Sequence, residues 1–255
     1  MIRKFRGLFF KAWYWYISAI DKNAEVIFMN FGYSDKSKKI IENEIDEKNR
    51  YSIQLYHHTA SPVDLSGKDI LEVGCGRGGG LSYVRNHLLP KTAVGVDLNG
   101  KAIQFCKQHY KFDNISFQQA NAQALPFPDN SFDVVLNVES SHRYPQVDLF
   151  FNEVSRVLKP GGYFLFTDFR NFDKIEELER QLVNSNLRIE TKTDITANVV
   201  EALELATPHR EQLIRKIAPR LLHELCRNFA ATIGTPTYNK FLNRKMLYVS
   251  YVLRN

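Results

Sequence analysis

The chain has little cysteine, and its three cysteines stand far apart. Cys75, Cys106 and Cys226 are too few and too scattered for a disulfide framework or a zinc site, and they are typical of a reducing compartment such as the cytoplasm. The 255 residues are 44% hydrophobic and 24% charged, which excludes a disordered or collagen-like chain. A chain of this length can fold as one domain without a disulfide or metal staple.

The sequence also lacks a hydrophobic run long enough to span a membrane. The best candidate, residues 8–20 (LFFKAWYWYISAI), is interrupted by Lys11, and a spanning helix needs about 20 apolar residues. Two interpretations of this aromatic segment stay open. It is either an amphipathic helix that contacts a membrane surface or an apolar substrate, or a cap helix that packs on the domain.

A concentrated basic stripe is absent as well. The net charge is +6, but residues 51–170 carry as many acidic as basic residues, so the excess lies toward the two ends. A nucleic-acid groove needs a dense positive surface, and we therefore expect no nucleic-acid partner. No acidic cluster has metal-ligand spacing, so we expect no bound metal. The oligomeric state is not readable from the sequence.

From residue 69 onward, short apolar runs alternate with helical stretches. The predicted strands cover residues 69–73, 92–96, 115–119, 132–137 and 163–167. The helices predicted in the gaps cover residues 79–87, 100–110 and 147–158. This alternation predicts βαβ units and a parallel sheet.

Beyond residue 168 the alternation loosens. The elements predicted there are a helix over 175–183, a strand over 188–193, one or two helices over 199–230 broken at Pro208 and Pro219, and a last strand over 245–253. We expect this last strand to close the edge of the sheet. The prediction is a single α/β domain with four parts: an N-terminal cap (1–60), a cofactor-binding core (61–170), a helical acceptor-pocket region (171–240) and a closing strand (241–255).

A glycine-rich turn, EVGCGRGGG, follows the first predicted strand. Gly74, Cys75 and Gly76 lie in this turn, where glycines let backbone amides approach a ligand at a helix N-terminus. Asp97 stands at the end of the next predicted strand, where a carboxylate can accept hydrogen bonds from a ribose diol. Together these residues predict a site for a ribose-bearing cofactor at the carboxyl ends of the strands.

The glycines alone do not separate NAD from S-adenosylmethionine, because Gly74, Gly76 and Gly79 also match the dinucleotide fingerprint. Glu72 does separate them, since a carboxylate two residues before the first glycine would face a cationic amino-acid group and would repel a pyrophosphate. Asn121-Ala122, after the third predicted strand, can hold an adenine edge. LPFPDNSFDVV and RVLKPGG flank the fourth and fifth predicted strands.

In this order, EVGCGRG, GVDL, LPFPDNSFDVV and RVLKPGG resemble the motif series of class I S-adenosylmethionine-dependent methyltransferases. More narrowly, NFGYSD, LYHHTASPVDLSGK, LNVESSHRYP and MLYVSYVL resemble the phthiotriol/phenolphthiotriol dimycocerosates methyltransferase group, which O-methylates a hydroxyl of lipid or polyketide-derived products. The resemblance implies an O-methyltransferase for a hydrophobic secondary metabolite or lipid-like alcohol. The alternatives are N- or C-methylation of another small molecule, an NAD-dependent oxidoreductase, or a protein that binds the cofactor without catalysis.

The resemblance also implies a seven-stranded, doubly wound sheet with an antiparallel last strand, and it assigns residues to S-adenosylmethionine. Those along the methionine, ribose and adenine groups are Glu72, Gly74, Gly76, Asp97, Leu98, Asn121, Ala122 and Asn137. The family more often has Asp at the position of Asn121. Tyr33 in NFGYSD either closes over the cofactor or is a packed aromatic.

A hydroxyl acceptor becomes a good nucleophile only when a base removes its proton. His142 in ESSHRYP follows the fourth predicted strand, where the acceptor is expected to lie. Related natural-product O-methyltransferases often have His at this position and Asp at the end of the fifth strand, which matches Asp168. We therefore predict His142 as the base, oriented by Asp168. Alternatively, His142 packs under a substrate lid, and Asp168 contacts the substrate or caps a helix.

Overall fold

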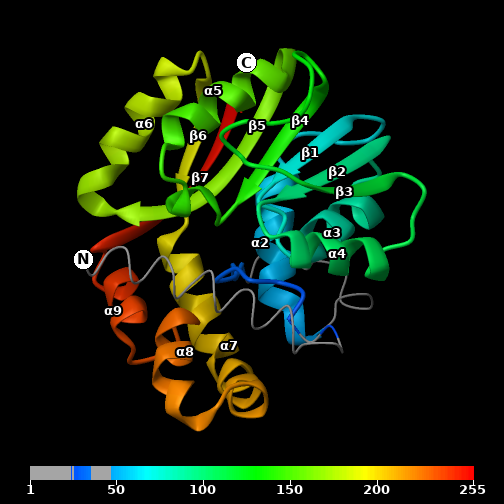
Figure 1. The fold of residues 1–255 in the computed structure, drawn as a ribbon. Coiled ribbons are helices and arrows are strands. Elements are labelled where there is room, and N and C mark those ends of the chain that lie inside the picture. Colours follow the sequence, from blue (N-terminus) through cyan, green and yellow to red (C-terminus); the bar gives the residue numbers. More distant parts are fainter. Residues whose placement is uncertain (1–23, 25, 36–46) are drawn as a thin grey trace.

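The computed structural model describes residues 24, 26–35 and 47–255 of the chain (Figure 1). The aromatic segment 8–20 lies outside the described residues. Its membrane and cap interpretations therefore both stay predictions.

The described residues form one seven-stranded sheet. Its strands are β1 (Asp69–Val73), β2 (Thr92–Asp97), β3 (Ile115–Gln119), β4 (Phe132–Val138), β5 (Leu158–Asn171), β6 (Arg188–Asp194) and β7 (Met246–Arg254). They are ordered β3-β2-β1-β4-β5-β7-β6, with β1 to β5 in parallel register and β7 antiparallel to both of its neighbours. The predicted doubly wound α/β fold with an antiparallel last strand is confirmed.

The position predicted for the last strand is wrong. Strand β7 does not close the edge but lies between β5 and β6, and β6 is the edge strand. The physical reason is the difference in polarity between the two strands. Strand β7 is buried along most of its length, whereas β6 (RIETKTD) is exposed at most positions. An apolar strand is covered by neighbours on both sides, while a charged strand is suited to the solvent-facing edge.

Helices cover both faces of the sheet (Figure 1). They are α2 (Arg50–Ala60), α3 (Gly79–His87), α4 (Gly100–His109), α5 (Val147–Val157), α6 (Ile175–Asn184), α7 (Thr196–Ile217), α8 (His223–Phe229) and α9 (Pro236–Leu242). Successive side chains of β4 point to opposite faces. Val134 and Leu136 pack in the same cluster as residues of α2 and α7, whereas Val135 packs with α5. Burial on both faces explains the continuous apolar sequence of this strand.

Helix α7 corrects a second prediction, since it continues through Pro208 and ends only before Pro219. A proline inside a helix removes one backbone hydrogen bond. Leu203 and Ile214, which lie on either side of Pro208 along the helix, are both buried against other elements. Tertiary packing therefore holds the helix together across the proline.

Helices α7, α8 and α9 form a lobe in the lower part of Figure 1, and the described residues 26–35 run between this lobe and α2. We call residues 26–31 the strap. None of the helices within the described ranges has the length and apolar composition needed to cross a bilayer.

Candidate active site

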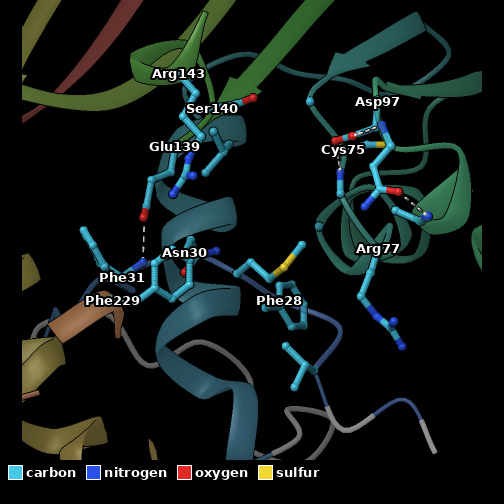
Figure 2. A pocket seen from close by; sticks show the side chains of 18 of the residues that line it. Phe28, Asn30, Phe31, Cys75, Arg77, Asp97, Glu139, Ser140, Arg143 and Phe229 are labelled. Carbon is cyan, nitrogen blue, oxygen red and sulfur yellow. Dashed lines mark hydrogen bonds between the residues drawn. The ribbon is translucent and has the colours of Figure 1, made fainter. Parts of the chain in front are cut away.

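A large cavity lies at the carboxyl ends of β1, β2, β4 and β5. Its volume is about 2560 Å³, whereas the pocket for a single ligand typically has about 300–1,000 Å³. The cavity is lined by the loops after these strands, by the strap, and by residues of α7 and α8. Figure 2 shows Cys75 and Asp97 on one side of the pocket and Glu139 and Phe31 on the other. The site therefore has room for two ligands side by side, at the place where open α/β sheets bind them.

The turn after β1 requires its glycines. Gly74 has a φ of 79°, and a Cβ there would lie 2.0 Å from the Ser140 hydroxyl oxygen. Gly76 has a φ of 53°, and a Cβ there would lie 3.0 Å from the terminal carbon of Met29 in the strap. At Gly74 the left-handed backbone and the lack of space together exclude a side chain. At Gly76 the left-handed backbone disfavours one, and the neighbour is only the flexible tip of Met29. Cys75, between them, is buried and lines the cavity.

Glu72 is fully buried behind this turn and is not itself among the described residues that line the cavity. Its Oε1 accepts a hydrogen bond of 2.7 Å from the Tyr56 hydroxyl, and its Oε2 has no partner among the described residues. Burial raises the pKa of Glu72 to about 7, with the Tyr56 hydrogen bond opposing the rise and the Asp97 carboxylate adding to it. Gly80 makes the contact feasible, since a Cβ there would lie 1.8 Å from the Tyr56 ring. A buried carboxylate with one open oxygen attracts a cationic group and repels a phosphate.

Asp97 ends β2 and lines the cavity next to the glycine turn. Its Oδ2 accepts a hydrogen bond of 2.9 Å from the Gly76 N–H, and its Oδ1 accepts one of 2.8 Å from the Asn99 N–H. Burial raises the pKa of Asp97, and the two N–H groups oppose this rise. Each carboxylate oxygen has a second lone pair, so Asp97 can still accept hydrogen bonds from a ribose diol.

Three further predicted cofactor residues line the cavity beyond Asp97. Leu98 is 60% exposed and offers an apolar surface to a flat ring. The Asn121 Oδ1 accepts a hydrogen bond of 3.1 Å from the Gln123 N–H, which orients its side-chain amide. Ala122 is buried beside it. This part of the cavity combines an apolar wall with an oriented amide, as recognition of an adenine requires.

Tyr33 and Asn137, like Glu72, are not among the described residues that line the cavity. Tyr33 is buried and stacks on His58, with ring centroids 4.4 Å apart, in line with its interpretation as a packed aromatic. The Asn137 Nδ2 donates a hydrogen bond of 2.7 Å to the Val73 carbonyl. Asn137 therefore supports the end of β1, and its buried Oδ1 has no partner among the described residues, so its contact with the methionine group stays a prediction.

His142 and Asp168 come together at the ends of the neighbouring strands β4 and β5. The His142 Nδ1 lies 2.8 Å from the Asp168 Oδ1. The Asp168 Oδ2 accepts hydrogen bonds from the Ser141 hydroxyl (2.7 Å) and the His142 N–H (2.9 Å), and the Arg170 guanidinium lies 3.2 Å from it. Burial would raise the pKa of Asp168, but the His142 ring and Arg170 hold it well below its usual range. Asp168 is therefore a permanent acceptor for the imidazole.

The second ring nitrogen of His142 faces Arg143. The Arg143 Nε–H donates a hydrogen bond of 3.1 Å to the His142 Nε2, so the network assigns the proton to Nδ1 and the lone pair to Nε2. Burial lowers the pKa of His142 below its ordinary value, with Asp168 opposing the change. Phe169 packs on the imidazole with centroids 4.2 Å apart. A neutral imidazole with an accepting Nε2 is the form that a general base needs.

Sequence reasoning missed Tyr56, Arg143 and Glu139 at this site. Glu139 and Arg143 stand in the same motif as His142, so their closeness to it was a usable signal. Tyr56 comes from α2, and only the packing of that helix on the sheet, where it contacts β4 and β5, brings its hydroxyl to Glu72. In the part of the chain that the structure describes, no three His, Cys, Asp or Glu side chains come together as metal ligands would.

Comparison with known proteins identifies the family. The family model described as "Methyltransferase domain" matches residues 71–166. The chain is 48% identical to the fatty-acid O-methyltransferase of Mycolicibacterium smegmatis over 204 aligned residues. The aligned stretch covers 80% of this chain and 74% of that protein. It is 41% identical to a phthiotriol/phenolphthiotriol dimycocerosates methyltransferase of Mycobacterium tuberculosis over 214 aligned residues. Here the aligned stretch covers 84% of this chain and 79% of that protein.

Solved structures of similar fold are more distant in sequence. The [4+2]-cyclase SpnF has a TM-score of 0.67 and 19% identity, over 89% of this chain and 87% of that chain. The geranyl diphosphate C-methyltransferase of Streptomyces coelicolor A3(2) has a TM-score of 0.65 and 16% identity, over 91% of this chain and 94% of that chain. One of the two is named as a cyclase and the other as a methyltransferase, so the likeness shows the fold alone. The reaction has to be argued from the residues of the site.

The fold and the cofactor end of the cavity define a methyltransferase that uses S-adenosylmethionine. The chain belongs to the class I S-adenosylmethionine-dependent methyltransferases, in the group that contains the two mycobacterial relatives. The residues present fit this cofactor, since Glu72 has an open buried oxygen, Asp97 keeps lone pairs for a diol, and the turn at Gly74 has no room for a Cβ.

Proposed function

We propose that this enzyme methylates an oxygen atom of a lipid-like acceptor and that His142 is the general base when that oxygen is a hydroxyl. The observation that carries the proposal is the imidazole held by Asp168 through Nδ1, with its accepting Nε2 at the cavity. The relatives support a lipid-like acceptor, because one is named for fatty acids and the other for phthiotriol dimycocerosates.

His142 and Asp168 divide the work at the acceptor. Bound S-adenosylmethionine supplies an electrophilic methyl group that needs no further activation. An acceptor hydroxyl that takes the place of the Arg143 Nε–H at the His142 Nε2 passes its proton to that nitrogen as the oxygen becomes methylated. The imidazolium formed in this step is stabilised by the Asp168 carboxylate, which is buried and fully ionised.

The end of the cavity formed by the helical lobe suits a hydrocarbon chain. Leu213 and Ile217 of α7, together with Leu225 and Phe229 of α8, line it. These side chains present an apolar wall across the cavity from the glycine turn. An acceptor with its reactive oxygen at His142 can therefore lay its chain along α7 and α8, where burial of each methylene contributes about 0.8 kcal/mol.

Arg143 favours a second candidate, the methylation of a carboxyl group. Its guanidinium lies at the His142 Nε2, in the same part of the cavity, and arginine binds carboxylates in a geometry that fixes both oxygens. The relative named as a fatty-acid O-methyltransferase fits this acceptor. A carboxylate is already deprotonated at neutral pH, so its methylation needs Arg143 for binding and no base.

An assay with matched acceptors tests the proposal. Purified enzyme and methyl-labelled S-adenosylmethionine are incubated with a long-chain alcohol, the fatty acid and the primary amine of the same length, and the products are identified by mass spectrometry. We expect a methyl ether or a methyl ester. Label that appears only on nitrogen or carbon would contradict O-methylation.

Replacement of Ile217 with tryptophan tests the apolar end of the cavity. The larger side chain projects from α7 into the space assigned to the chain, so we expect the KM for a long-chain acceptor to rise about tenfold. The KM for a short-chain acceptor should change little. Leu221→Trp is the control, because Leu221 is 97% exposed and does not line the cavity. Equal effects on long and short acceptors would contradict the assignment.

A further inference from the structure

Glu139, the residue after β4, joins the sheet to the strap. Its Oε2 accepts a hydrogen bond of 2.7 Å from the Phe31 N–H and one of 2.8 Å from the Tyr248 hydroxyl of β7. Figure 2 shows the contact with Phe31 as a dashed line at the pocket wall. One carboxylate oxygen thus connects β4, β7 and the backbone of the strap.

Arg210 of α7 holds the same stretch of the strap through its carbonyl groups. Its Nη2 donates hydrogen bonds to the carbonyls of Phe31 (2.9 Å) and Asn30 (3.2 Å), and its Nη1 donates to the Ala230 carbonyl (2.6 Å). Burial lowers the pKa of Arg210 to about 10, so the guanidinium stays charged at neutral pH. The backbone of Phe31 is therefore held by an acid at its N–H and by a cation at its carbonyl.

The N-terminal part of the strap lies against the cofactor end of the cavity. A Cβ at Gly76 would lie 3.0 Å from the Met29 side chain, and one at Gly79 would lie 2.7 Å from the Ile27 carbonyl oxygen. The Phe28 ring packs on Tyr56, with centroids 5.9 Å apart. The strap therefore covers the glycine turn and the tyrosine that holds Glu72.

The C-terminal residue of the strap lies against the acceptor end. The Phe31 ring packs on Phe169 with centroids 5.4 Å apart, and Phe169 packs on His142 at 4.2 Å. A displacement of Phe31 would therefore move the wall that holds the imidazole.

From these contacts we propose that Glu139 is a positioning residue that fixes the strap across the cavity, so that the strap encloses the cofactor and seats the Phe169 wall beside His142. Glu139 has a φ of 49°, a left-handed conformation that is costly for a side-chain-bearing residue and that concentrates at functional sites. Nothing in this role depends on the atom that is methylated, so the proposal goes beyond the proposed function.

The test compares Glu139→Ala with Glu139→Gln in the full chain. Alanine removes the acceptor of the Phe31 N–H, and we expect the Kd of S-adenosylhomocysteine, measured by calorimetry, to rise about tenfold. Glutamine keeps an amide oxygen at this place and should restore most of the affinity. Glu179→Ala is the matched control, because Glu179 accepts a similar bond of 2.9 Å from Tyr251 of β7 and does not line the cavity.

A folded Glu139→Ala variant with wild-type affinity would overturn the proposal. If that variant does not fold, hydrogen exchange of the Phe31 amide in Glu139→Gln is the deciding measurement. It is made at pH 9, because burial raises the pKa of Glu139 to about 8 and only the ionised wild-type carboxylate binds the N–H more strongly than the neutral amide of glutamine does. We expect this amide to exchange several-fold faster than in the wild type and to be protected again by S-adenosylhomocysteine. Unchanged exchange would contradict the role. Both readouts use the cofactor alone, so failure of the O-methylation proposal would leave them unaffected.

Discussion

Replacement of His142 with alanine is expected to lower turnover of a hydroxyl acceptor by about 10²–10⁴-fold, the usual contribution of a positioned general base. The alanine variant lacks the imidazole that Asp168 orients, and with it the base that would accept the proton of the hydroxyl. Turnover of a carboxyl acceptor should fall far less, because a carboxylate has no proton to lose. Parallel assays of one alcohol and one fatty acid at saturating cofactor measure both effects.

The pH profile supplies the second measurement on His142. Burial places the pKa of His142 below its ordinary value, so the base is neutral at pH 7 and becomes protonated only in more acidic solution. The kcat/KM for a hydroxyl acceptor should therefore fall as the pH decreases through that pKa, and His142→Ala should lack this inflection. His87→Ala is the control, since His87 is exposed on α3 and stacks on Tyr83 outside the cavity. Equal losses with alcohol and acid would show that His142 has another role.

Replacement of Glu72 with glutamine is expected to weaken S-adenosylmethionine binding about tenfold at pH 8 and to remove the pH dependence of that binding. The wild-type carboxylate has a pKa of about 7 and must be ionised to attract the cationic cofactor. The wild-type Kd should therefore decrease as the pH rises from 6 to 8, with proton release on binding near pH 7. Calorimetry in buffers of different ionisation enthalpy measures this release.

The same substitution should stabilise the fold. The pKa of Glu72 in the folded protein lies above its ordinary value of 4.5. The stabilising effect of the raised pKa on the fold is therefore fully present below pH 4.5 and is lost as the pH rises through about 7. A rise from 4.5 to about 7 corresponds to about 3 kcal/mol at pH 8. Thermal unfolding at pH 8 should show a higher Tm for Glu72→Gln than for the wild type.

Tyr56→Phe is the matched variant for Glu72. It removes the hydrogen bond that lowers the pKa of Glu72 and leaves the charge in place. The inflection in cofactor affinity should move to higher pH, whereas in Glu72→Gln it should disappear. An unchanged inflection in both variants would show that another group carries the pH dependence.

The cofactor turn was predictable because its contacts are between residues that follow neighbouring strands. Gly76 and Asp97 stand after β1 and at the end of β2, and parallel pairing of these strands brings the Gly76 N–H to the Asp97 carboxylate. The pairing of His142 with Asp168 follows in the same way from β4 and β5, where Val138 lies opposite Thr167. Their catalytic roles remain predictions.

Other residues were harder to place because the side on which a residue lies depends on the whole sheet. Successive residues of a strand point to opposite faces, so Val138 lines the cavity while its neighbour Asn137 is buried against the Val73 carbonyl. Strand β7 is apolar along its length, yet its position inside the sheet depends on the polar β6 as the alternative edge. The continuity of α7 through Pro208 likewise depends on packing that no local pattern contains.

Motif order and spacing were enough to establish the α/β class, the cofactor and the glycine turn, because each depends on residues close in sequence or on adjacent parallel strands. The contacts that hold the strap, in contrast, depend on the tertiary structure alone. Glu139 and Phe31 are 108 residues apart, and Arg210 and Phe31 are 179 apart. Such contacts form only when the strap, the sheet and α7 have packed together, since a single hydrogen bond contributes too little to specify a long-range pairing by its own strength.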